Sequence, residues 1–108
     1  MSFPDLVRRF EQAPSATDSF KFFYRESFEL MNSDPENAAL LFIVGSIAKA
    51  FVRKYEDQEL SPEFVDAAKR LMLRMSHKAL HAMADTPAVR LRAAGEIATE
   101  YEWKITSF

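Results

Sequence analysis

The stretch Asn37–Ala48, NAALLFIVGSIA, decides the fold because it runs for twelve residues without a charge in a chain that is 28% charged. Such an apolar run must lie away from water, in a membrane or in a protein core. A transmembrane helix needs about 20 predominantly apolar residues, and this run ends at Lys49. The stretch therefore predicts a helix in the core of the protein.

The size and composition of the chain are those of one globular domain spanning residues 1–108. Because the chain has no cysteine, disulfides and thiolate metal sites are excluded. The amino terminus carries Asp5, Arg8 and Arg9 where a signal peptide would need apolar residues. We therefore expect a cytoplasmic protein without an export signal.

The prolines of the chain stand between apolar-periodic segments and never inside one, which is typical of helix boundaries. Three of them follow a capping residue, as Asp34-Pro35, Ser61-Pro62 and Thr86-Pro87. Ser15 and Asp18 resemble a capping box. The pattern predicts an all-α fold with helices at about residues 4–12, 16–32, 35–56, 62–84 and 87–102.

The third predicted helix has apolar side chains around more than half of its circumference. Its remaining strip consists of Phe42, Ser46, Lys49 and Arg53. A helix of this kind must be contacted from two sides, and its small residues, such as Gly45, let a neighbour approach closely. We therefore expect a single-domain bundle of about five helices with a central, mostly buried third helix.

Two phenylalanines fall on polar helix faces. Phe22 lies opposite the apolar stripe of the second helix, and Phe42 lies beside Lys49 and Arg53 on the third. If the fold brings the two rings together, they form the kind of aromatic anchor that protein interfaces favour. The predicted partner-binding residues are Phe22, Phe42, Lys49 and Arg53. The alternative is that both rings are isolated surface residues, or make core contacts at a helix crossing.

The fourth predicted helix carries a basic stripe opposite its apolar face, and no acidic residue occurs between Asp66 and Asp85. The stripe consists of Arg70, Arg74, His77, Lys78 and His81. It is either a solvated face whose cations suit the helix C-terminus, or an anion-binding site for an acidic protein or a nucleic acid. The net charge of −2 disfavours nucleic acid.

The spacing of His77 and His81 also suits a metal ion, with Asp85 one further turn along the helix. However, His77 and Asp85 are separated by about 12 Å along a helix, too far to share an ion with ligand bonds of about 2 Å. The neighbouring cations would repel a metal as well. We therefore predict no metal and no cofactor.

Catalytic motifs are lacking in the sequence: it has no glycine-rich phosphate loop and no Gly-x-Ser-x-Gly turn, and Ser76 and His77 lie on different sides of their helix. At the carboxyl end, Tyr101, Trp103 and Ile105 alternate with polar residues, so a short extended segment competes there with helix.

The expected function is a non-enzymatic protein–protein interaction module of bacterial origin: an adaptor, an immunity-type inhibitor, a secretion chaperone or an antitoxin. We expect a homodimer, because two-fold dimers are the commonest oligomers, and no membrane association. The alternative is an anion- or nucleic-acid-binding regulator that uses the basic stripe, and an enzyme ranks third.

Overall fold

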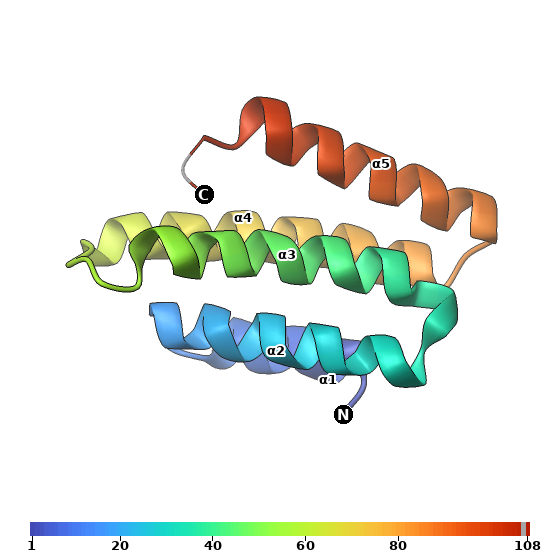
Figure 1. The fold of residues 1–108 in the computed structure, drawn as a ribbon, viewed down its shortest axis with the longest axis horizontal. Helices are drawn as coiled ribbons and strands as arrows, with labels where there is room; N and C mark the ends of the chain where they lie inside the picture. The colour runs from blue at the N-terminus through green and yellow to red at the C-terminus, as the bar shows by residue number, and fades with distance from the viewer. Residues whose placement is uncertain (107) are drawn as a thin grey trace.

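The computed structural model describes residues 1–106 and 108 and is built from α-helices, which confirms the all-α prediction (Figure 1). No strand occurs among the described residues. The elements in chain order are α1 (Phe3–Gln12), α2 (Thr17–Ser33), the short 3-10 turn η1 (Pro35–Asn37), α3 (Ala38–Tyr55), α4 (Pro62–Met83) and α5 (Pro87–Lys104).

Helix α3 occupies the middle of the bundle, as predicted, and contacts α2, α4 and α5. In Figure 1, α1 and α2 lie along one side of α3 and α5 lies along the other. Helix α1 also contacts α2 and α4. The molecule measures 41 × 30 × 19 Å, so its shortest dimension is about two helix diameters.

Capping residues fix the beginnings of α4 and α5 as predicted. Ser61 Oγ accepts a hydrogen bond from the backbone N–H of Phe64 at 3.2 Å, and Thr86 Oγ1 accepts one from Val89 at 3.3 Å. These bonds satisfy N–H groups that have no partner inside the helix.

Two other predicted helix caps are wrong, although the helices begin close to the predicted residues. Helix α2 follows Ala16 without a side-chain cap, so Ser15 and Asp18 form no capping box there. The capping box of the chain is instead at α1, where the Ser2 and Asp5 side chains bond each other's backbone N–H groups. Asp34 caps nothing: its carboxylate accepts from Asn37 Nδ2 at 2.9 Å, and the residues after it form η1 before α3 begins.

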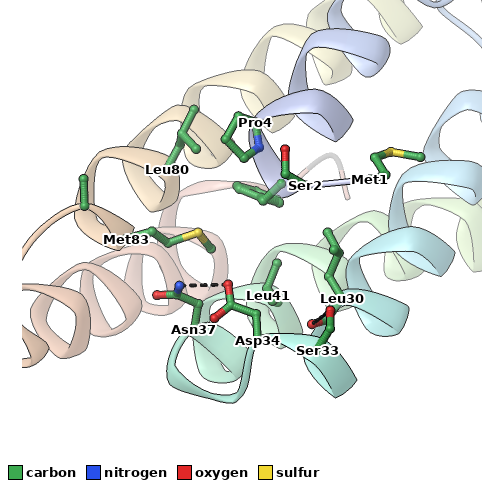
Figure 2. Close-up of a pocket in the computed structure, with 12 residues that line it drawn as sticks. Met1, Ser2, Pro4, Leu30, Ser33, Asp34, Asn37, Leu41, Leu80 and Met83 are labelled. Carbon is green, nitrogen blue, oxygen red and sulfur yellow. Dashed lines mark hydrogen bonds between the residues drawn. The ribbon is translucent and has the colours of Figure 1, made fainter.

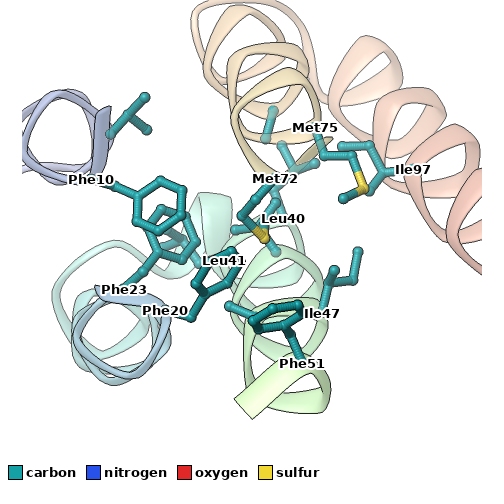
Figure 3. Close-up of a cluster of buried hydrophobic side chains, with 14 of the residues drawn as sticks. Phe10, Phe20, Phe23, Leu40, Leu41, Ile47, Phe51, Met72, Met75 and Ile97 are labelled. Atoms are coloured by element: carbon teal, nitrogen blue, oxygen red, sulfur yellow. The ribbon is translucent and has the colours of Figure 1, made fainter. Parts of the chain in front are cut away.

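The core is rich in aromatic rings that join α1, α2 and α3 (Figure 3). Phe20 stacks on Phe51 with ring centroids 4.2 Å apart, and Phe10 lies 5.1 Å from both Phe20 and Phe23. Figure 3 shows methionine and isoleucine side chains closing the other side of α3 from α4 and α5. The buried residues of α3 are Leu40, Leu41, Val44, Gly45, Ile47, Ala48, Phe51 and Val52.

Gly45 lets α2 approach α3 closely, as the sequence predicts. A Cβ atom at this position would lie 2.7 Å from Cε1 of Phe28 and 3.2 Å from Cβ of Ser27. Because real Cβ contacts are longer than the first of these distances, the Phe28 ring occupies space that any other residue at position 45 would need.

The segment Pro35–Tyr55 is long and apolar enough to cross a membrane by length and composition, although its uncharged run stops at Lys49. In the fold it packs against three other helices instead. The fold buries Leu41, Val44 and Ile47 of this segment, while Phe42 stays exposed.

The carboxyl end combines the two expected conformations. Helix α5 continues to Lys104, and Ile105 is extended with φ −103° and ψ 101°. Ile105 and Phe108 are buried, and the Phe108 ring lies 5.2 Å from Phe51. Ile105 and Phe108 therefore contribute to the core, while Trp103 remains 79% exposed.

Replacement of Ile47 by Asp tests the central position of α3. Ile47 is 3% exposed, so the new carboxylate would be buried without a partner. We expect the free energy of unfolding in urea to fall by more than about 3 kcal/mol, a large share of a total of about 5–15. Ala39→Asp, on the exposed first turn of α3, is the control and should leave stability within about 0.5 kcal/mol. Equal urea midpoints for the two variants would contradict a central α3.

Replacement of Gly45 by Leu tests the close contact between α2 and α3. Leucine is the better helix former by almost 1 kcal/mol, but its side chain would collide with the Phe28 ring. We expect a net loss of about 1–3 kcal/mol from overpacking, measured by thermal unfolding. Ala39→Leu, at an exposed position of the same helix, should be nearly neutral. A stabilised Gly45→Leu variant would show that the contact is looser than the structure indicates.

Candidate functional site

A surface groove between α2 and α3 gathers most of the predicted partner-binding residues. Its volume is about 530 Å³. It is lined by Phe28, Met31, Phe42, Ser46, Lys49, Ala50 and Arg53. Phe42, Lys49 and Arg53 were predicted from the sequence, so the fold places these three at one site.

Aromatic rings form the floor of this α2–α3 groove. The Phe28 ring lies 5.8 Å from Tyr24 and 5.9 Å from Phe42, measured between centroids. Lys49 Nζ lies over the same rings, 5.8 Å from the Phe28 centroid and 6.0 Å from that of Tyr24. Phe42 is nevertheless 54% exposed. The groove therefore offers a large aromatic surface to solvent, held in place by its neighbours.

Positive charge gathers at the other end of the groove. Neither Lys49 nor Arg53 forms a salt bridge with any residue that the structure describes. Beyond them, Lys21 pairs with Glu56 at 3.7 Å. Arg25 lies on the same side of α2 as Lys21 and Phe28, because positions i, i+4 and i+7 share a helix face. The groove thus runs from an apolar end to a cationic one.

Phe22 does not belong to this site. It is 42% exposed but does not line the groove, and none of the aromatic pairs between described residues includes it. Phe22 and Phe28 are six residues apart, which is about 120° around a helix, so only Phe28 turns toward Phe42. The predicted anchor of Phe22 with Phe42 is therefore not formed. Phe28 and Met31 belong to the apolar stripe of α2, opposite Phe22, and both are half-buried.

A second pocket, of about 460 Å³, lies where the ends of α1, α2, α3 and α4 meet (Figure 2). Its apolar walls include Leu30, Leu41 and Met83. Asp34 and Asn37 lie together at one edge, and the buried Asn37 Oδ1 has no hydrogen-bond partner among the described residues. The sequence pattern gave no signal for this pocket, because its walls come from four separate helices.

The predicted anion-binding stripe on α4 is largely paired with acidic side chains of other helices. Arg74 forms a salt bridge with Glu100, Lys78 Nζ lies 2.6 Å from Glu96 Oε2, and His77 Nε2 lies 3.5 Å from Glu11 Oε2. The hydrogen bond from Lys78 lowers the pKa of Glu96 below its usual value. In the described part of the chain, the stripe residues without an acidic partner are Arg70 and His81.

Charge reversal at Arg74 tests this pairing. The side chain of Glu100 is only 19% exposed, so Arg74→Glu would set a second carboxylate beside a partly buried one. We expect the free energy of unfolding to fall by about 1–2 kcal/mol in urea titrations at low salt. Arg70→Glu, on the same stripe without an acidic partner, should change stability by no more than about 0.5 kcal/mol. Similar losses in both variants would contradict a specific role for the Arg74–Glu100 pair.

The α2–α3 groove combines exposed aromatic area with cations, and the second pocket combines apolar walls with oxygen acceptors. Among the described residues, no group of three or more His, Cys, Asp or Glu side chains is placed to hold a metal ion. The chain matches no protein-family model, and no curated protein or solved structure is significantly similar to it.

Proposed function

We propose that this protein is a non-enzymatic interaction module that binds an acidic, amphipathic helical segment of another protein in the α2–α3 groove. The observation that carries the proposal is Phe42, which is 54% exposed on the most apolar helix of the chain. Its ring pairs with that of Phe28, and it lines the same groove as the cations Lys49 and Arg53.

The apolar end of the groove has the composition of an interface centre. Aromatic residues, methionine and arginine are enriched where proteins meet, and Phe28, Met31, Phe42 and Arg53 all line this groove. The rings of Phe28 and Phe42 lie against each other, so little side-chain freedom is lost on binding. An apolar side chain of the partner inserted here would gain burial at low entropic cost.

The cationic end supports an acidic partner. The chain as a whole has a net charge of −2, so Lys49 and Arg53 form a local exception. Lys49 already contacts the faces of two rings, and a carboxylate beside it would replace water with a charge-assisted hydrogen bond. Charge complementarity of this kind speeds association and selects the partner.

The length of the groove supports a helical segment. Phe42 and Arg53 are eleven residues apart on α3, which is about 16 Å or three helical turns. A partner helix lying along α3 would set apolar residues at i and i+3 or i+4 on Phe28 and Phe42. Its acidic residues, one to two turns further on, would then reach Lys49 and Arg53.

Such a groove would suit an adaptor, an immunity-type inhibitor, a secretion chaperone or an antitoxin. We propose that the protein acts in the cytoplasm of a bacterial cell. The alternative of an anion-binding regulator is less favoured, because Arg74, His77 and Lys78 of its basic stripe already have acidic partners.

The proposal predicts which substitutions abolish partner capture from native lysate by the tagged protein. Phe42→Ser should remove the partner, since a hot-spot aromatic contributes more than about 2 kcal/mol to binding. Lys49→Glu combined with Arg53→Glu should weaken capture at least tenfold, and raising the salt should weaken capture by the parent in the same direction. All variants should keep the parental circular dichroism.

Phe22→Ser is the matched control, because Phe22 is a similarly exposed phenylalanine outside the groove. It should capture the partner as the parent does. A partner retained by Phe42→Ser and lost by Phe22→Ser would overturn the assignment of the groove. Capture of nucleic acid that depends on Arg70 would favour the alternative function.

A further inference from the structure

Helix α5 carries the two most exposed large apolar side chains of the described chain. Leu91 is 75% and Trp103 is 79% exposed. Helix α5 lies at the edge of the bundle and packs against α3 and α4 on one side only (Figure 1). Its outer side therefore has no neighbour within the described part of the molecule.

A seam of exposed small and apolar residues runs along this side of α5. Its members alternate at spacings of three and four, as residues do at a helix–helix contact. They are Ala88, Leu91, Gly95 and Ala98, followed by Glu102. A Cβ at Gly95 would meet nothing within 4 Å, so the backbone is open to close approach there. Trp103 flanks the end of the seam.

We propose that a second copy of this chain covers the seam, with the two α5 helices packed antiparallel about a two-fold axis. In the register that we propose, the two-fold axis passes at the height of Ile97 along the helix. Leu91 then lies at the same height as the partner subunit's Trp103. The same register sets Arg92 level with the partner subunit's Glu102. It also brings Gly95 level with the partner subunit's Thr99, so small residues meet where the helices cross.

Charge complementarity argues for a second copy in this orientation. Arg92 and Glu102 are exposed, and neither forms a salt bridge with a described residue. Glu102 lies in the last turn of α5, where a negative charge is unfavourable for the helix dipole. Antiparallel pairing sets each of these charges beside the opposite charge of the other copy. Parallel pairing would bring like charges together.

The dimer leaves the α2–α3 groove free, because α2 and α5 lie on opposite sides of α3 (Figure 1). One helix pair is a small interface, so the association is reversible and depends on protein concentration. The inference does not rest on the proposed partner binding, since it concerns a different face of the molecule.

Trp103 allows a direct test, because it is the only tryptophan of the chain. Sedimentation equilibrium of the full chain should give a monomer–dimer equilibrium, and tryptophan emission should shift to shorter wavelength as the dimer fraction rises. Leu91→Glu should raise the dissociation constant at least tenfold, without changing the circular dichroism. Phe22→Ser, on α2 and away from α5, should dimerise as the parent does.

A charge swap separates this antiparallel pairing from other modes of association. Arg92→Glu should weaken the dimer several-fold, and adding Glu102→Arg to it should restore the parental dissociation constant. A parent that remains monomeric at millimolar concentration would overturn the proposal. A dimer whose dissociation constant is unchanged by Leu91→Glu would also overturn it. So would a dimer that is weakened further when Glu102→Arg is added to Arg92→Glu.

Discussion

The contact of α2 with α3 at Gly45 is the constraint on which the rest of the structure depends. Because Phe28 Cε1 lies only 2.7 Å from the position that a Cβ of residue 45 would take, the two helices pack closely in this register. In that register Phe20 stacks on Phe51 inside the core, and Phe28 meets Phe42 at the surface. The same contact therefore builds the aromatic core and the floor of the α2–α3 groove.

The distribution of charge separates the two basic surfaces of the molecule. On α4, Arg74 and Lys78 pair with glutamates of α5, and His77 Nε2 lies 3.5 Å from Glu11 Oε2 of α1. At the α2–α3 groove, Lys49 lies over aromatic faces without an acidic partner among the described residues. A cation that the fold leaves unpaired is more available to a partner than one that it already uses.

Helices α2 and α5 lie on opposite sides of α3, and α3 contacts both of them. Helix α3 is covered by α2 on one side and by α4 and α5 on its other sides. Each of these outer helices therefore keeps its outward face exposed. A dimer through α5 would carry two grooves, so two linked partner segments would bind with a higher effective concentration than one.

The sequence by itself determined the helices, most of their boundaries and the central place of α3, because periodicity, proline positions and capping residues are local signals. It also identified Phe42, Lys49 and Arg53, because the helical periodicity of α3 places these three residues on one narrow strip of its surface. That Phe28 and not Phe22 joins them follows only from the tertiary packing, since it depends on which face of α2 lies against α3. The pairing of Arg74 with Glu100 was likewise beyond the sequence, because the two residues meet only when α5 packs on α4.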